Sequence, residues 1–542
     1  MKSIITILLA LVAMAGLAQV KSGLDLCLRD EATGEWLIGL FDDYAIYDCE
    51  YWNYAEVGKD HVVLTKDGLR KEILLKKNST IIDGSKHKTS VLKTKCLPDY
   101  PTRDETAWPG GIQAEEGNFT LRVCVRTTKK EAEFNIWIRR MVDGKQIEEY
   151  AKIDEQGRFE VKMPVNGTSI LGIRNEFEHL LEHSFWGRLA VDDGDTLLLY
   201  IDDVINRFYV MGGKYARFNN ELLGSDFYPD FTTPKGLAFD SIITQQCRSM
   251  AMCQTRIDSL NAVRPNLSRR FRTYYLDDIQ NSFASPLLRN CWLTYNKEEQ
   301  QDMLSKTEAK LNPLQWMRSE VPLMCRDGFK INILYYIFVL ADLRSTGLTD
   351  PDVFLLRIYQ ERKVQLTDEE LQTIKDFQEL RTNKNRDVSL NEAFQTKIIP
   401  ILSKPLIAQY WDWELSEQNV AMQVNVLNSL DIDDDTREIL KTQTFVNNID
   451  GKSNVASPRI LRLAHQEVHH PRLIQAIDNA NQRIIDFLAE NERQEVVTPK
   501  AGSPASLRVP EEVLKDITDG KALFESITAP FRGYVIYVDV WG

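Results

Sequence analysis

The stretch TLRVCVR, Thr120–Arg126, alternates apolar and polar side chains and sets the fold class in the middle of the chain. A period of two is the pattern of a β-strand that buries one face. The same alternation returns at Phe134–Ile138 and at Phe159–Met163, with the turn residues Asp154–Gly157 between them. Strands spaced in this way predict an antiparallel β-sandwich, which we place at residues 111–212.

A second β-rich segment precedes the sandwich. Short apolar and aromatic runs at Trp36–Phe41, Tyr44–Tyr54 and His61–Leu64 are separated by turn residues. Such runs are typical of strands joined by tight turns. The sequence therefore predicts an N-terminal β domain at residues 19–110, which ends in a connector that contains proline and glycine.

From residue 213 to residue 491 the apolar residues recur at helical spacing. Capping residues predict helix starts at Thr367–Glu370, Asp435–Ile439 and Ser457–Ile460. No fixed repeat period is present, so we expect an irregular all-helical domain rather than a solenoid. The apolar run Ile331–Leu343 within this domain is too short to cross a bilayer and predicts a fully buried helix.

The C-terminal residues change character twice. Residues 492–510 mix charged residues, proline, glycine and serine without apolar periodicity, which predicts a linker. Tyr534–Trp541 then forms a nearly continuous β-branched and aromatic strand that one acid, Asp539, interrupts. Such strands belong to sheets covered on both faces, where a carboxylate is costly unless it is paired or protonated. Asp539 is therefore a candidate functional residue, and the alternative is an aspartate exposed to water at the end of a strand.

The segment RGYVIYVDVWG, Arg532–Gly542, resembles the strand that leads into the active site of TlpA-like thioredoxin-fold proteins, which are exported thiol–disulfide oxidoreductases. The resemblance implies that residues 511–542 are the incomplete start of a thioredoxin-like α/β domain. It also implies that Asp539 matches the family's buried acid, which assists proton transfer at the resolving cysteine. Trp541 matches the aromatic residue just before the cysteine pair, whereas Tyr534 departs from the family's usual lysine.

Thiol–disulfide exchange of this family needs a Cys-x-x-Cys pair that supplies an attacking thiolate and a resolving thiol. No such pair occurs in the sequence, and the family's pair would begin a few positions beyond Gly542. We therefore expect the chain to be the non-catalytic N-terminal portion of such an oxidoreductase, truncated just before the motif and without turnover of its own. Protein thiols and disulfides are the expected substrates where the redox module is complete, and no cofactor is expected.

The first residues predict export. A short basic start precedes the apolar run Ile4–Leu17, and the small residues Gly16 and Ala18 suit a signal peptidase. We therefore expect a signal peptide at residues 1–18 and cleavage before Gln19. The apolar run is shorter than a membrane-spanning helix, so no transmembrane segment is expected after cleavage. The expected location is the periplasm or the cell envelope.

Charge and cysteine content limit the function classes further. The net charge is −13 and no basic stripe is concentrated in the sequence, which argues against nucleic acid as a partner. An exported protein can form disulfides, and the spacing leaves open Cys27 with Cys49 or Cys96, and Cys247 with Cys253.

Three polar clusters resemble metal sites only in part. His179 and His183 stand four residues apart among predicted strands, where such a pair lies about 13 Å apart. The segment His465–His470 lacks a glutamate directly after its first histidine, as a zinc protease motif would need. Asp431–Asp435 lacks the glycine of a calcium loop, so helix capping is the expected role there. No metal is therefore expected.

An alternative function belongs to another class. The aromatic residues of the N-terminal β domain, Trp36, Tyr47, Tyr51, Trp52 and Tyr54, suit a stand-alone envelope protein that binds a glycan or a peptide. In the competing interpretation these side chains form the core of the domain.

Overall fold

The computed structural model describes residues 22–493 except 93–98, 114, 176–185, 226–235, 295, 312–316, 345–349, 383–391 and 453–454. Residues 1–484 form one compact unit, and only the end of the last helix is described in the second unit, residues 485–542. The predicted signal peptide and the predicted thioredoxin-like start therefore lie outside the described residues.

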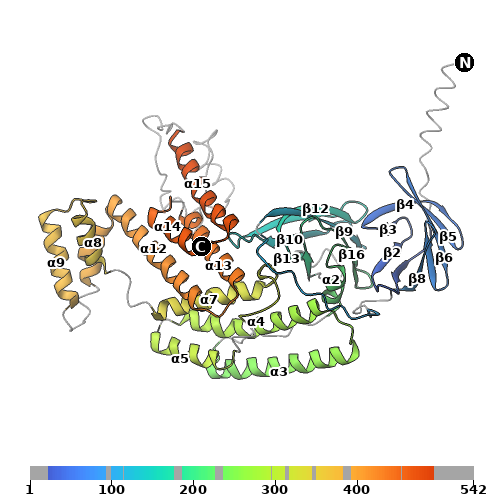
Figure 1. Ribbon diagram of the computed structural model, residues 1–542, viewed down its shortest axis with the longest axis horizontal. Helices are drawn as coiled ribbons and strands as arrows, with labels where there is room; N and C mark the ends of the chain where they lie inside the picture. Colours follow the sequence, from blue (N-terminus) through green and yellow to red (C-terminus); the bar gives the residue numbers. More distant parts are fainter. Residues whose placement is uncertain are drawn as a thin grey trace, which may run out of the picture. The chain divides into compact units, whose positions relative to one another are not determined.

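The N-terminal β domain is a closed barrel of eight antiparallel strands that follow one another in sequence order, with β8 paired back to β1 (Figure 1). Three of its hairpins turn at Asp48–Cys49, Asp67–Gly68 and Asp83–Gly84, where both residues have positive φ, as type I′ turns require. Trp52, Leu64 and other apolar side chains fill the interior. The strands are β1 (Leu26–Asp30), β2 (Trp36–Leu40), β3 (Ala45–Tyr47), β4 (Glu50–Val57), β5 (His61–Lys66), β6 (Leu69–Lys76), β7 (Ser79–Ile82) and β8 (Ser85–Val91).

The sandwich has two four-stranded sheets, with strand orders β11-β10-β13-β14 and β12-β9-β15-β16. The strands are β9 (Glu116–Arg126), β10 (Glu133–Arg139), β11 (Gln146–Lys152), β12 (Arg158–Asn166), β13 (Ser169–Asn175), β14 (Trp186–Val191), β15 (Thr196–Asp202) and β16 (Arg207–Gly212). The prediction of a wholly antiparallel sandwich was wrong in one respect, because β15 runs parallel to β9. Its predecessor β14 belongs to the other sheet, so no hairpin joins β15 to β9 and their relative direction is not set by a tight turn.

Both sheets of the sandwich also pack their outer faces against neighbouring parts of the chain. Leu198 and Tyr200 of β15 pack with Trp36 and Phe41 of the barrel, while their neighbours Leu197 and Leu199 face the interior of the sandwich. On the other sheet, one end of the outer face packs against the helices α2 and α4 through a separate cluster that includes Ile170, Ala190, Phe218 and Phe271. The sandwich therefore lies between the barrel and the helical layer.

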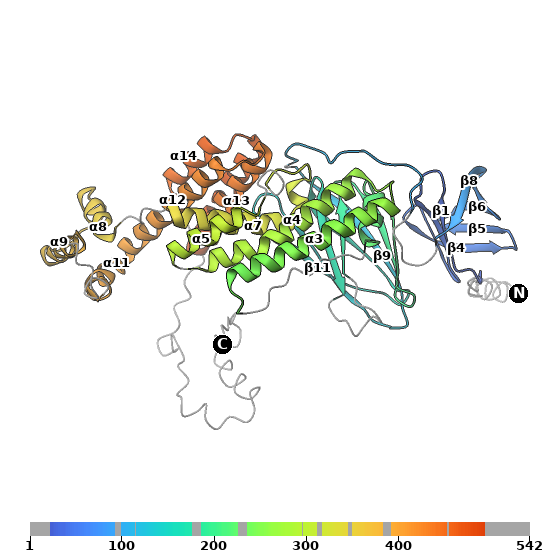
Figure 2. The same ribbon diagram turned by 90° about the horizontal axis from the view of Figure 1, so that it is seen from below.

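The helical region contains α2 (Ala216–Leu223), α3 (Phe239–Val263), α4 (Arg269–Leu293), α5 (Lys297–Glu308), η1 (Leu323–Cys325), α7 (Asp327–Arg344), α8 (Pro351–Gln360), α9 (Asp368–Thr382), η2 (Phe394–Ile398), α11 (Ile399–Leu402), α12 (Pro405–Ser429), α13 (Asp434–Lys452), α14 (Pro458–Glu467) and α15 (Pro471–Arg493). Helices α3 and α4 run side by side, and α7 contacts α4 and α12 (Figure 2). A separate apolar cluster joins α8, α9, α11 and the start of α12.

The helix starts follow the capping residues. Thr367 and Glu370 form a reciprocal capping box before α9, with the Glu370 N–H donating to Thr367 Oγ1 and the Thr367 N–H donating to Glu370 Oε2. Asp433 Oδ1 accepts the Thr436 N–H at the start of α13, and Ser457 Oγ accepts the Ile460 N–H at the start of α14. These contacts confirm the predicted helix starts.

The apolar run Ile331–Leu343 lies in α7, but the prediction of a fully buried helix was wrong. Ile333 and Val339 are completely buried, whereas Ile331, Leu334 and Phe338 are 37–42% exposed on another face. The packing of α4 and α12 covers part of the helix circumference and leaves this face open. Within the described ranges, no helix combines the length and the apolar character that a bilayer crossing needs.

A carboxyl group with a raised pKa lies where the barrel meets the connector. Glu35 Oε2 is buried without a hydrogen-bond partner in the described part of the chain. Burial raises the pKa of Glu35 to about 7; Arg217 opposes this shift, while Glu221 and Asp104 add to it. The buried side chain of Tyr100 lies against Gly34. The guanidinium carbon of Arg217 lies over the Tyr100 ring, 4.3 Å from the ring centroid.

We expect this group to make stability depend on pH. The folded protein binds the Glu35 proton more tightly than the unfolded chain, whose carboxyl titrates near 4.5, so the free energy of unfolding falls as pH rises from about 4.5 through about 7. Glu35→Gln should therefore lose less stability than the wild type between about pH 5 and about pH 8. Urea unfolding of both proteins at the two pH values measures this difference, and an equal loss in both would contradict it.

Candidate functional site

The described thiols are the first place to look for redox chemistry. Seven of the eight cysteines lie in the described residues, all with free thiols, and only Cys247 is partly exposed. Cys27 therefore does not pair with Cys49, nor Cys247 with Cys253, while Cys96 lies outside the described residues. An exported location permits disulfides but does not require them in a chain with large apolar cores.

Burial also makes the described thiols poor nucleophiles. It raises the pKa of Cys27 to about 12, and the pKa values of Cys49, Cys124, Cys253 and Cys291 to about 11. The pKa of Cys325 is raised as well, again by burial. Because the thiolate is the attacking species, these side chains behave as small core residues.

The residues that the sequence predicts as functional are not brought together in the described part of the chain. Asp539 and Trp541 lie outside it, as do His179 and His183. His465 Nε2 lies 2.8 Å from Asp478 Oδ1 in an exposed contact. Among the described residues, no three His, Cys, Asp or Glu side chains are grouped as metal ligands.

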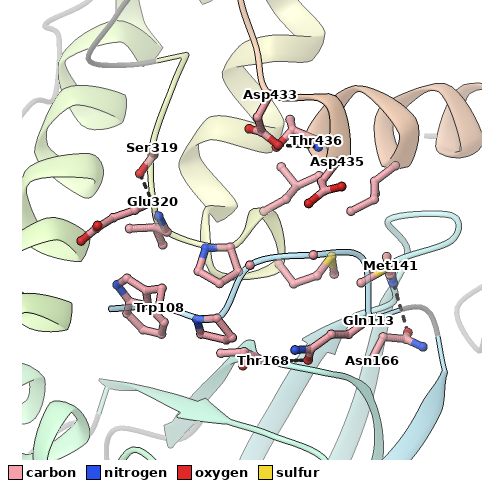
Figure 3. Close-up of a pocket in the computed structure, with 18 residues that line it drawn as sticks. Trp108, Gln113, Met141, Asn166, Thr168, Ser319, Glu320, Asp433, Asp435 and Thr436 are labelled. Atoms are coloured by element: carbon pink, nitrogen blue, oxygen red, sulfur yellow. Dashed lines mark hydrogen bonds between the residues drawn. The ribbon is translucent and has the colours of Figure 1, made fainter. Parts of the chain in front are cut away.

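A pocket of about 290 Å³ lies where the connector, the sandwich and the helical region meet (Figure 3). Asp433 and Asp435 project from the start of α13 on one side, opposite Gln113 and Thr168. The described residues that line it include three carboxylates and no basic side chain. However, Glu320 is paired with Arg269 and Asp433 caps α13, so two of these carboxylates have structural roles. The pocket suits a small cationic group, and none of the described residues that line it carries a thiol or an imidazole.

A larger groove of about 1,610 Å³ lies between loops of the barrel and loops of the sandwich. The guanidinium carbon of Arg158 lies 4.6 Å from the ring centroid of Tyr44 and 4.2 Å from that of Tyr51. Asp25 of the barrel pairs with Arg126 and Arg207 of the sandwich, at 2.7 and 3.2 Å. These contacts bind the two domains together, and the lining mixes acidic and basic side chains.

The barrel aromatics do not form the binding platform considered from the sequence. Trp52 and Tyr54 are each 5% exposed in the barrel core, and Trp36 packs against the sandwich. The Tyr51 hydroxyl donates to the Val123 carbonyl at 3.1 Å. Their positions support the interpretation that these side chains have a core role.

A different aromatic group is exposed on the sandwich. We define the aromatic face as Asn135, Trp137, Glu148, Tyr150, Arg174 and Trp186, which share the outer side of the sheet β11-β10-β13-β14. Asn135 lies opposite Tyr150 and Arg174 in the strand register, Arg174 lies opposite Trp186, and Trp137 lies opposite Glu148. Trp186 is 62% exposed and Tyr150 is 55% exposed.

Sequence reasoning missed this face. Its residues come from four strands, and only the sheet order and register bring them together. One feature of the sequence could have indicated it. Asn135 and Trp137 alternate with the apolar residues of the Phe134–Ile138 strand, so their side chains point away from the core. This alternation indicates an exposed tryptophan but cannot identify its neighbours.

Comparison with known proteins identifies no relative: no protein-family model matches the chain, and neither does any curated protein.

The burial of the thiols predicts their reactivity. Among the described cysteines, Ellman's reagent should label Cys247 first in the native protein, whereas the six buried thiols should react only after unfolding in guanidinium. Peptide mapping separates the described cysteines from Cys96, and Cys247→Ser serves as the control. Labelling of any of the six at the rate of Cys247 would contradict this assignment.

The barrel aromatics predict a stability effect rather than a binding effect. Trp52→Ala should destabilise the barrel by about 3–5 kcal/mol, because it opens a cavity in the core. Trp186→Ala is the matched control and should cost about 0.5 kcal/mol or less, because that side chain is mostly exposed. Hydrogen exchange as a function of urea measures both effects, in peptides from β4 and β5 for Trp52→Ala and in peptides from β13 and β14 for Trp186→Ala, and equal costs would contradict the assignment of Trp52 to the core.

Proposed function

We propose that this chain is the non-catalytic N-terminal portion of an exported TlpA-like thiol–disulfide oxidoreductase. The observation that carries the proposal is the segment Arg532–Gly542, whose strand residues, acid and tryptophan follow the family's pattern up to the position of the cysteine pair. In this proposal, Asp539 and Trp541 belong to the redox centre, and the domains before them bind or position its partners.

The properties of the described thiols support the non-catalytic part of the proposal. Six are buried and have pKa values raised by burial, which opposes thiolate formation at neutral pH. The sequence also contains no Cys-x-x-Cys pair that would give an attacking and a resolving thiol. Disulfide exchange by this chain alone would therefore need a different mechanism.

A second candidate function is a stand-alone binding protein of the cell envelope, without a redox role. The aromatic face favours it, because an exposed tryptophan and tyrosine on a sheet are typical of recognition surfaces. This candidate needs neither the resemblance at the C-terminus nor a cysteine pair.

We expect residues 19–542 to reduce insulin disulfides no faster than dithiothreitol alone, because the sequence contains no Cys-x-x-Cys pair and six of the seven described thiols are buried. Precipitation of the insulin B chain measures the rate, and a complete thioredoxin is the positive control. Turnover that disappears on replacement of one native cysteine by serine would contradict the non-catalytic assignment.

The family assignment has a separate test. The nucleotide sequence after codon 542 should encode a Trp-Cys-x-x-Cys motif within a few codons, in the same or a shifted frame. An unrelated sequence in all frames would remove the support for the redox family and leave the binding candidate.

A further inference from the structure

The described helices cover one end of the sheet β11-β10-β13-β14 and leave the aromatic face, at its other end, uncovered. At the covered end of the same sheet, Arg188 pairs with Asp278 of α4 at 2.8 Å, and Arg139 lies 3.4 Å from Asp327 of α7. Trp186 lies at the other end of β14. Its side chain is 62% exposed, more than that of any other tryptophan in the described part of the chain. Together with Tyr150, which is 55% exposed, Trp186 gives this face two exposed aromatic side chains rather than a single one.

The aromatic rings of the face are fixed in position. Trp137 lies across β13 directly over Gly172, where a Cβ atom would come within 2.1 Å of the indole. The rings of Trp137 and Trp186 meet edge to face, with centroids 5.8 Å apart and planes at 74°. The Arg174 guanidinium lies 5.6 and 5.5 Å from the two ring centroids. A bound ligand would therefore meet rings that lose little freedom on binding.

The polar groups beside the rings are also held in place. Glu148 accepts hydrogen bonds from Asn135 Nδ2 at 3.1 Å, from the Tyr150 hydroxyl at 3.0 Å and from Gln146 Nε2 at 2.6 Å. These three donors lower the pKa of Glu148, which is therefore ionised at neutral pH. Asn135 is only 2% exposed, so one member of this hydrogen-bond network is a buried amide.

The charges of the aromatic face balance. Arg174 contributes one cation and Glu148 contributes one anion, so the surface offers no net attraction to a polyanion or to a polycation. The row from Tyr150 through Asn135 and Arg174 to Trp186 crosses three strand spacings, or about 14 Å. A ligand that fills this row is extended and neutral, presents apolar C–H faces to the rings, and hydrogen-bonds to fixed amide, carboxylate and guanidinium groups.

We propose that the aromatic face binds a neutral oligosaccharide chain. The electron-rich faces of Trp137, Trp186 and Tyr150 receive the C–H faces of successive sugar rings, because the ring quadrupole attracts such hydrogens. Glu148 accepts hydrogen bonds from sugar hydroxyls, and Arg174 donates to their oxygens. This inference deepens the second candidate function and does not depend on the redox assignment.

Affinity electrophoresis in native gels tests the proposal. The acidic chain migrates toward the anode, and its mobility is compared in gels with and without hydroxyethyl cellulose, xylan, laminarin or glycol chitin. At least one of these polysaccharides should retard the wild-type protein. Trp186→Ala and Trp137→Ala should each weaken the retardation constant by about tenfold or more, because each removes a stacking surface of the site.

Trp292→Ala is the matched control, because Trp292 is 43% exposed on α4, stacks on Tyr335 and lies outside the aromatic face. It should leave the retardation unchanged, and near-ultraviolet circular dichroism verifies the fold of each variant. Glu148→Gln should weaken binding without removing an aromatic ring, since it replaces a charged acceptor by a neutral amide.

Two results would overturn the proposal: no retardation in any of the four polysaccharides, with or without retardation in a casein gel, or retardation that survives Trp186→Ala and Trp137→Ala together. Retardation in the casein gel alone would assign the face to peptides. The outcome of the insulin assay is independent of both results, so the failure of one proposal is distinguishable from the failure of the other.

Discussion

Strand β15 has no face open to solvent, and the arrangement of the β domains depends on this constraint. Leu197 and Leu199 fill the interior of the sandwich, while Leu198 and Tyr200 pack against the barrel, all at 1% exposure or less. Each such side chain contributes about 1.5–3 kcal/mol when it leaves water. The ring of Tyr200 stacks on Phe41 of the barrel with centroids 4.7 Å apart. Without the barrel, this face of the sheet would expose a row of apolar groups.

The other sheet of the sandwich divides its outer surface between two roles. Ile170 and Ala190 lie beneath the helices, whereas Trp137 and Trp186 lie beyond them. A recognition surface built in this way sits on strands that the sandwich core already fixes. Six of the seven described thiols have the opposite placement, buried in apolar clusters, whereas Cys247 is partly exposed. The described part of the chain therefore exposes aromatic rings on one sheet and buries six of its seven described thiols.

Alternation and capping chemistry predicted the local structure well. The strands around Val123 and Ile136 and the capping box of Thr367 and Glu370 follow from neighbours in the sequence. The closure of the barrel did not follow, because the pairing of β8 with β1 joins residues about sixty positions apart. The open face of α7 at Leu334 also depends on which helices pack beside it, and apolar composition alone cannot give that answer.

The candidate site shows the same limit. Trp52 and Trp186 are both tryptophans next to β-rich sequence, yet one lies in the barrel core and the other lies in water. The difference arises from strand order, which decides whether a given sheet face meets another layer. The sequence therefore located the aromatic residues and left open whether those of the barrel lie in its core, but it could not show which aromatic side chains the fold leaves exposed.

The parallel pairing of β9 with β15 has a consequence for how the chain acquires its structure. Thr120 pairs with Thr196, so a central ladder of the sandwich joins segments that are separated by the whole of the intervening sheet. Contacts of such long sequence separation form slowly, because the entropy of closing the loop is lost before the contacts are gained. During synthesis, the sheet that contains β9 is complete only after seven later strands have left the ribosome. Until then, the barrel lacks the complete sheet against which it packs. The attachment of the barrel therefore depends on a ladder that forms late in synthesis, because Leu198 and Tyr200 of β15 supply part of the surface that the barrel packs against.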